Sequence, residues 1–122
     1  MTPDPGHTVQ VLRDGNTVSA RIRGPLNGET APLCWERLSA ALVTECEMLA
    51  LDLGAVEYVD SDGIRWLQRA HAELVTRRIR IRLAVREGSR VERTLRLLKL
   101  DEQFQIERYP TEDCQGALSS AA

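Results

Sequence analysis

The apolar residues of this chain recur with two different periods, and the periods predict which segments are strands and which are helices. Residues 17–23 and 79–85 alternate apolar with polar side chains, which is the period of a strand with one buried face. Residues 48–53 are almost continuously apolar, as expected of a strand at the centre of a sheet. Residues 64–74 place their apolar side chains three and four positions apart, which indicates an amphipathic helix.

Turn and capping residues mark the boundaries of the earlier elements. Asp14-Gly15-Asn16 is a turn sequence, so residues 9–11 and 17–23 are expected to pair as an antiparallel hairpin. A first helix is expected to begin after Thr30, as its cap, and to end near Thr44. The buried stripe of this helix comprises Trp35, Leu38 and Leu42.

The C-terminal third of the chain predicts one clear helix and two weaker elements. Ser89 and Glu92 have the spacing of a capping box, which opens a helix. The apolar face of this helix comprises Val91, Leu95 and Leu98. Residues 104–108 form a short candidate strand, and residues 111–118 form a candidate helix.

The order of these elements predicts an α/β fold. Strands and helices alternate after the hairpin, which requires parallel strands joined by right-handed crossovers. Strands covered on both faces are apolar on both faces, but here arginines occupy outward positions. These are Arg21, Arg23, Arg80 and Arg82. We therefore predict a single domain over residues 1–122, with an ordered core of about 8–118. It contains a mixed, mostly parallel sheet with an N-terminal hairpin and helices packed on one face.

Composition and charge exclude some classes of partner. A chain of 122 residues with 43% hydrophobic and 28% charged residues is ordinary for one globular domain. The net charge is only −2, but residues 77–99 are strongly basic. We interpret this segment as a solvated basic face, or alternatively as a docking surface for an acidic partner. Direct binding of nucleic acid is not expected, because the segment has no aromatic residues on which bases could stack.

The sequence indicates a cytoplasmic protein without membrane insertion. No apolar run approaches the roughly 18 residues of a membrane span, and the first residues do not resemble a signal peptide. An odd number of cysteines without metal-binding spacing is typical of reduced thiols in the cytoplasm. These cysteines are Cys34, Cys46 and Cys114.

Few residues could support catalysis, so no enzymatic activity and no cofactor are expected. The chain has no glycine-rich phosphate loop. His7 lies in the N-terminal segment, and His71 is expected to be packed in the protein and not to act as a base. Asp52, Asp60 and Asp62 fall near predicted strand ends, where open α/β sheets often bind ligands. A magnesium site formed by these three carboxylates is a minor alternative.

The segment that joins the central strand to the second helix contains the main candidate site. Asp60 is expected to fix the turn, and Ser61 falls at the positive end of the helix dipole, which favours negative charge. From its position alone, Ser61 is either a helix cap or a modification site. Gly63 permits a close approach by a partner's backbone or a nucleotide. Trp66 is either a core residue or an anchor for a protein interface.

The motif Asp60-Ser61-Asp62-Gly63-Ile64, preceded by Leu51-Asp52-Leu53 and Val56-Glu57-Tyr58-Val59, resembles the signature of STAS domains. It is most similar to that of the bacterial anti-sigma-factor antagonists. Gly24-Pro25-Leu26-Asn27 is similar to the segment before the family's first helix, and residues 96–104 to the exit of its third helix.

The resemblance implies that Ser61 is phosphorylated by a partner kinase, because in the antagonists the modified serine follows this aspartate. The chain departs from the family at two nearby positions. Asp62 stands where the family usually has a hydroxyl residue, and Asn27 stands where it usually has an aspartate.

The implied function is that of an anti-sigma factor antagonist. Unphosphorylated, it would bind an anti-sigma factor that is also a serine kinase; phosphorylated, it would dissociate, and a phosphatase would reset it. The implied partner-binding residues are Asn27, Asp60, Ser61, Asp62, Gly63, Arg65 and Trp66. Two alternatives remain. One is a non-switching subunit of a membrane (lipid) transport complex that binds its ABC ATPase. The other is a STAS domain that senses a nucleotide or another small molecule.

Overall fold

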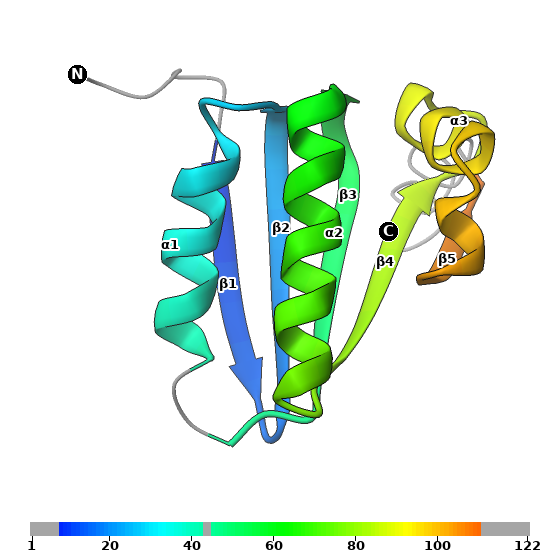
Figure 1. Ribbon diagram of the computed structural model, residues 1–122. Coiled ribbons are helices and arrows are strands. Elements are labelled where there is room, and N and C mark those ends of the chain that lie inside the picture. Colours follow the sequence, from blue (N-terminus) through cyan, green and yellow to red (C-terminus); the bar gives the residue numbers. More distant parts are fainter. Residues whose placement is uncertain (1–7, 43–44, 111–122) are drawn as a thin grey trace, which may run out of the picture.

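A computed structural model describes residues 8–42 and 45–110 as a sheet with helices beside it (Figure 1). The predicted helix at residues 111–118, Cys114 and His7 lie outside the described residues. The elements in chain order are β1 (Thr8–Asp14), β2 (Thr17–Leu26), α1 (Ala31–Ala41), β3 (Met48–Val59), α2 (Ser61–Thr76), β4 (Arg80–Arg86), α3 (Arg90–Leu97), the short 3-10 helix η1 (Leu100–Glu102) and β5 (Gln105–Tyr109).

The sheet has the predicted topology. Its strand order is β1-β2-β3-β4-β5, so β3 is the central strand. Strands β1 and β2 form the antiparallel hairpin, whereas β2 to β5 are parallel. At the hairpin turn Gly15 has a φ of 63°, a left-handed conformation that glycine adopts without steric cost. The mixed, mostly parallel sheet with an N-terminal hairpin is therefore confirmed.

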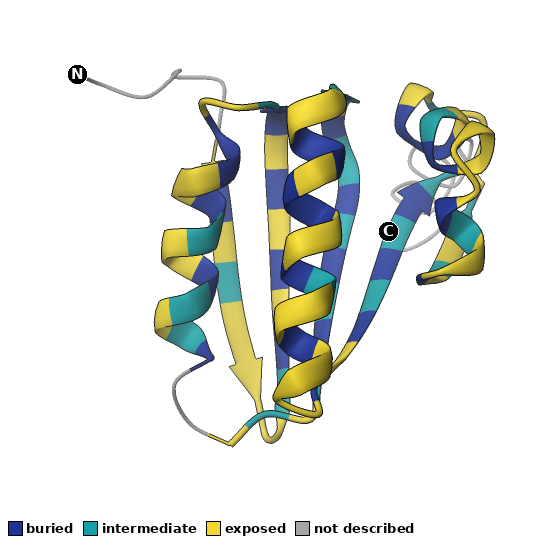
Figure 2. Cartoon of the chain, in the orientation of Figure 1, coloured by how far each residue is buried: buried dark blue, intermediate teal, exposed yellow. Residues whose placement is uncertain are grey.

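One face of the sheet is free of helices, as the arginine pattern predicted. Along β2 the side chains of Val18, Ala20 and Ile22 are buried, while the alternate residues are exposed (Figure 2). Helices α1 and α2 lie together over one face of the sheet (Figure 1). The ring of Phe104 lies 4.8 Å from that of His71 on α2, which places the segment before β5 on the same side. His71 is thus in a packed position.

Aliphatic side chains fill the space between the sheet and the helices. Leu51 of β3 has an exposed fraction of 1% and is paired in register with Ala20 of β2 and Leu83 of β4. Helix α2 contributes Leu67 and Leu74, which have no exposed surface. Burial of these side chains removes their apolar surface from water. The packing of Leu67 and Leu74 therefore holds α2 in place across the strands.

Two predicted features of the helices are wrong. Helix α1 ends at Ala41, with Leu42 at its C-cap, and therefore stops before Thr44. Leu98 is 53% exposed and does not belong to the apolar face of α3, because the helix ends at Leu97 and the chain turns at Lys99, where φ is 58°.

The Ser89 half of the predicted capping box is confirmed, whereas the buried Glu92 carboxylate bonds the amide of Gly88 and not that of Ser89. The Ser89 hydroxyl accepts a hydrogen bond from the Glu92 amide at 3.1 Å. The Glu92 carboxylate accepts one from the Gly88 amide at 3.2 Å and faces Arg108 at 3.2 Å and Arg96 at 3.6 Å. Burial alone would raise the pKa of Glu92, but the Gly88 hydrogen bond and the two guanidinium groups outweigh it and hold the pKa below 4.5.

Replacing Glu92 with glutamine is expected to lower the melting temperature at neutral pH. A carboxylate whose pKa is lowered by folding stabilises the protein above its unfolded-state pKa, near 4.5. That contribution disappears as the pH falls through the lower folded-state pKa. Thermal melts at decreasing pH should therefore show the two proteins converging. Glu36→Gln, at an exposed position on α1, is the control. A constant difference at every pH would contradict the role of the charge.

Candidate functional site

The start of α2 is capped by Asp60. Its backbone is extended, with φ −94° and ψ −174°, and its carboxylate accepts a hydrogen bond from the Gly63 amide at 2.9 Å. Its own amide donates to the carbonyl of Leu26 at 3.3 Å, which ties the end of β3 to the end of β2. Asp60 therefore fixes the turn ahead of the helix, as predicted.

Ser61 is the first residue of α2 and is exposed. Its hydroxyl makes no hydrogen bond to any residue that the structure describes, since Asp60 already occupies the capping position. The interpretation of Ser61 as the helix cap is therefore wrong. What remains is an accessible hydroxyl at the positive end of a helix of 16 residues, where added negative charge is stabilised.

Gly63 is required by packing inside the protein. A Cβ atom at this buried position would lie 2.3 Å from the carbonyl oxygen of Leu26 and 2.8 Å from a methyl carbon of Val59. Both distances are shorter than van der Waals contact allows. The close approach that the sequence suggested is thus made by the end of β2, within the same chain. This contact sets the position of Ser61 relative to the β2–α1 loop.

Asp62 and Arg65, one and four positions after Ser61, form an ion pair on the exposed surface of α2. The Asp62 carboxylate lies 3.3 Å from the Arg65 guanidinium, and both side chains are more than half exposed, at 55% and 66%. Across the loop, Gly28 lies against Asp62, because a Cβ at Gly28 would be 3.0 Å from a carboxylate oxygen of Asp62. The negative charge of Asp62 is therefore partly balanced by Arg65.

Asn27 organises the loop that borders this site. Its side-chain carbonyl accepts hydrogen bonds from the amides of Glu29 and Thr30, at 2.9 and 3.0 Å. Its amide nitrogen donates to the Tyr58 hydroxyl at 3.4 Å. Thr30 does not cap α1 with its side chain; its hydroxyl instead donates to the carbonyl of Pro25 at 2.9 Å. The structure thus brings the Asn27 loop next to the start of α2.

Trp66 lies mainly in the core, with an exposed fraction of 9%. Its indole nitrogen is buried and has no hydrogen-bond partner among the described residues. The tryptophan also lines the hollow that Gly28, Asp62 and Arg65 border. The core alternative is therefore confirmed, and the small exposed part of Trp66 faces a groove beside the candidate site.

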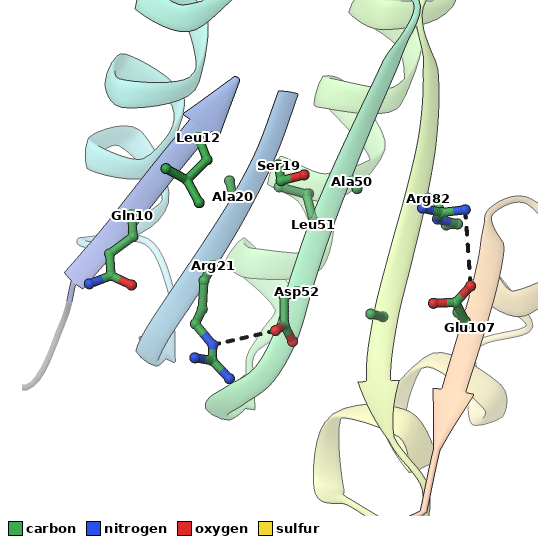
Figure 3. A pocket seen from close by; sticks show the side chains of 11 residues that line it. Gln10, Leu12, Ser19, Ala20, Arg21, Ala50, Leu51, Asp52, Arg82 and Glu107 are labelled. Atoms are coloured by element: carbon green, nitrogen blue, oxygen red, sulfur yellow. Dashed lines mark ion pairs between the residues drawn. The ribbon is translucent and has the colours of Figure 1, made fainter. Parts of the chain in front are cut away.

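The three aspartates do not form a metal site. Asp52 lies on the helix-free face of the sheet, 3.4 Å from Arg21 (Figure 3). Asp60 instead caps α2. Asp52 also accepts hydrogen bonds from the Tyr109 hydroxyl at 3.2 Å and the Gly54 amide at 2.9 Å. In the part of the chain that the structure describes, no group of three acidic, histidine or cysteine residues could hold a metal ion.

The network around Asp52 was not predicted from the sequence. A Cβ at Gly54 would lie 1.5 Å from the Tyr109 hydroxyl oxygen, so the glycine leaves room for the phenol over β3. A glycine inside a strand often marks such a close approach, which was the available signal. The Tyr109 contact connects the last strand to the centre of the sheet.

The basic segment does not form one face. Arg80 and Arg82 lie on the helix-free side of the sheet, where Arg82 is 4.0 Å from Glu107 (Figure 3). Other arginines of the segment lie on α3, and Arg90 lies 5.9 Å from the centre of the Tyr58 ring.

In the described residues no helix is long and apolar enough to cross a membrane.

Comparison with known proteins identifies the family of this chain. Residues 8–113 match the STAS domain family. No curated protein matches the sequence. Among solved structures, an anti-sigma factor antagonist from Mycobacterium paratuberculosis is 23% identical, with a TM-score of 0.75 over 95% of this chain and 97% of that one.

Two further structures have the same fold. The anti-sigma factor antagonist SpoIIAA in its unphosphorylated form is 16% identical, with a TM-score of 0.69 over 93% of this chain and 97% of that one. A Shewanella loihica protein with a SpoIIAA-like fold is 15% identical, with a TM-score of 0.57 over 100% of this chain and 99% of that one. The family match covers most of the sequence, and the topology agrees with it: the chain belongs to the STAS domain family.

Proposed function

We propose that this protein is an anti-sigma factor antagonist controlled by phosphorylation of Ser61. In this proposal the unphosphorylated protein binds an anti-sigma factor that is also a serine kinase, and the phosphorylated protein releases it. A phosphatase restores the binding form. The protein itself acts by binding in the cytoplasm and catalyses no reaction.

The observation that carries the proposal is the position of Ser61. Its hydroxyl is exposed on the first residue of α2, and the capping role that would otherwise explain a serine there belongs to Asp60. The neighbouring residues are held in place: Gly63 is pressed against Leu26, and Asn27 orders the facing loop. A kinase therefore meets a reactive group on a rigid support. The shared fold with proteins named anti-sigma factor antagonists supports the same function.

A phosphate at this position would change binding without unfolding the domain. It adds about −1.5 to −2 charges at neutral pH. Inside the protein that charge is favoured by the helix N-terminus. In a close-packed interface the same charge must be desolvated, which is costly unless the partner offers a cation. Release of the partner then follows from the loss of interface stability alone.

The test uses three proteins and the cognate kinase, identified by pull-down from the source cells. Wild-type protein incubated with kinase and ATP should carry phosphate on Ser61, as located by mass spectrometry. Ser61→Ala should bind the kinase as tightly as wild type and stay bound when ATP is added. Ser61→Asp should bind at least about tenfold more weakly, because a charge enters the interface.

Three results would contradict the proposal. Equal phosphate incorporation into wild type and Ser61→Ala would move the modification to another residue. Recovery of an ABC transporter ATPase as the bound partner, with no phosphate on Ser61 in cells, would favour the transport-subunit function instead. Stabilisation by ATP or GTP alone in thermal melts would favour the sensing function.

Asp62 is expected to slow phosphorylation of Ser61. Two like unit charges about 4 Å apart repel by on the order of 1–4 kcal/mol at effective dielectric constants between 80 and 20, and Asp62 directly follows Ser61. Arg65, at 3.3 Å, offsets part of this cost. Asp62→Ser should therefore be phosphorylated on Ser61 faster than wild type at low salt, with a smaller difference at high salt. Rates are measured by site-resolved mass spectrometry, because the new serine is itself a possible substrate.

Two variants separate the charge from other effects. Asp62→Asn removes the charge without adding a hydroxyl and should give the same acceleration. Glu36→Ser removes an exposed carboxylate from α1, away from the start of α2, and should leave the rate unchanged. Wild-type rates for both Asp62 variants at every ionic strength would mean that Asp62 serves only the helix start.

A further inference from the structure

A groove between α1 and α2 starts beside the candidate site and continues along both helices beyond it. The two helices run side by side over the sheet and begin at the same end (Figure 1). Two hollows follow one another between them, of about 340 and 500 Å³. Pro32, Trp66 and Arg69 line both hollows, so the two form one continuous groove. Its upper end is bordered by Gly28 and Asp62, and its lower end by Glu73 and Arg77.

The wall of the groove is unusually aromatic for this chain. The protein has 2 tryptophans, and both line the lower hollow together with Pro32 and Ala70. The indole nitrogen of Trp66 is buried and lacks an acceptor among the described residues. Buried polar groups in proteins are nearly always hydrogen-bonded. The Trp66 nitrogen is an exception, but it has no accessible surface, so a ligand in the groove would contact the exposed edge of the indole ring.

The charges along the groove leave one cation available. Residues 65, 69 and 73 of α2 and Arg77 at its C-cap follow each other at four-residue spacing, so they lie in one row. Arg65 pairs with Asp62 at 3.3 Å, and Arg77 pairs with Glu73 at 3.1 Å. Arg69, between these two pairs, has no ion pair with any described residue. It can therefore offer its guanidinium to a carboxylate in the two-pronged geometry that arginine favours.

We propose that the groove between α1 and α2 binds an amphipathic monocarboxylate, with its apolar body against Trp35 and Trp66 and its carboxylate on Arg69. One free cation matches one negative charge. Asp62 and Glu73, in the pairs on either side of Arg69, disfavour a ligand with two charges, such as a phosphate monoester. The apolar side chains that line the lower hollow suit a ring or a short alkyl chain; they are Pro32, Trp35, Trp66 and Ala70.

Tryptophan fluorescence tests this site directly, since both tryptophans of the chain line the groove. The probe is 3-phenylpropanoate, and its neutral match is 3-phenylpropanamide. The carboxylate should shift the emission saturably, with a Kd of about 0.1–1 mM as expected of so small a ligand. The amide and phenyl phosphate should bind at least about tenfold more weakly, because only the monocarboxylate satisfies Arg69 without excess charge.

Matched variants assign the effect to Arg69. Arg69→Gln should weaken binding of the carboxylate about tenfold or more and leave the weak binding of the amide unchanged. Arg93→Gln removes one exposed arginine from α3 and should bind like wild type. Arg69→Lys, which keeps the charge without the two-pronged geometry, should fall between them. Circular dichroism confirms that each variant is folded.

Several outcomes would overturn the proposal. These are an emission that no probe changes, equal binding of carboxylate and amide, tighter binding of phenyl phosphate, or equal losses in Arg69→Gln and Arg93→Gln. An emission that instead changes with protein concentration, in step with a monomer–dimer equilibrium seen by sedimentation, would mean that a second copy of the chain covers the groove. Failure of this proposal would leave the Ser61 experiments unaffected.

Discussion

Replacing Leu51 with alanine is expected to lower the free energy of unfolding by about 2–5 kcal/mol, the usual cost of a large-to-small change in a well-packed core. Leu51 is 1% exposed in the central strand, with β2 on one side and β4 on the other. Neighbours held by two ladders of backbone hydrogen bonds cannot easily collapse into the cavity. Urea denaturation followed by circular dichroism measures the change.

Leu12→Ala is the matched control for this experiment. Leu12 belongs to the sheet as well, but it is 74% exposed on the edge strand β1. Its truncation removes little buried surface and should change the free energy of unfolding by less than about 0.5 kcal/mol. A loss below about 1 kcal/mol for Leu51→Ala would contradict its placement at the centre of the core.

Gly63→Ala should also destabilise the protein, by about 1–3 kcal/mol or more, as is typical of an added group that has no space. Helix propensity alone predicts the opposite, since alanine in a helix is favoured over glycine by up to about 1 kcal/mol. The new Cβ would meet a backbone carbonyl oxygen at 2.3 Å, and a backbone atom cannot turn aside as a side chain can. The sign of the change therefore distinguishes packing from propensity.

The control for Gly63→Ala is the same substitution at Gly28. There the new Cβ would meet the end of the Asp62 side chain at 3.0 Å, and this side chain is free to move. The expected change is below about 1 kcal/mol, the range of most exposed substitutions. If denaturation curves for the two variants coincide, α2 does not pack against the end of β2 as described. A destabilised Gly63→Ala protein should also be a poorer kinase substrate, because Ser61 moves with the first turn of α2.

Local patterns in the sequence were sufficient for most of the fold. The outward arginines predicted the helix-free face because burying an unpaired guanidinium costs far more than covering that face would gain. Ser89 predicted the start of α3 because its hydroxyl accepts a hydrogen bond from the amide of Glu92, only three residues further on. Such features are decided within a few residues and are therefore visible in one sequence.

The ends of helices, and the choice between two neighbouring capping residues, were harder to predict, because the local sequence does not decide them. Asp60 and Ser61 are both good capping residues, and neither is preferred by its local sequence. The choice falls on Asp60 because β3 continues to Val59 and is held there by the bond from the Asp60 amide to Leu26. Leu98 fits the helical period, but the chain leaves the helix one residue earlier. The tertiary structure decided which residue caps α2 and where α3 ends.

The sequence by itself determined the order of strands and helices, most of the buried residues, the helix-free face of the sheet and the motif around Ser61. Only the tertiary structure decided that Gly63 serves an internal contact, that Tyr109 reaches Asp52 across 57 positions, and that both tryptophans line one groove. The physical reason is the range of the interactions. Periodicity and capping depend on neighbours along the chain, whereas steric fit, buried hydrogen bonds and grooves depend on residues that meet only when the sheet and its helices have assembled.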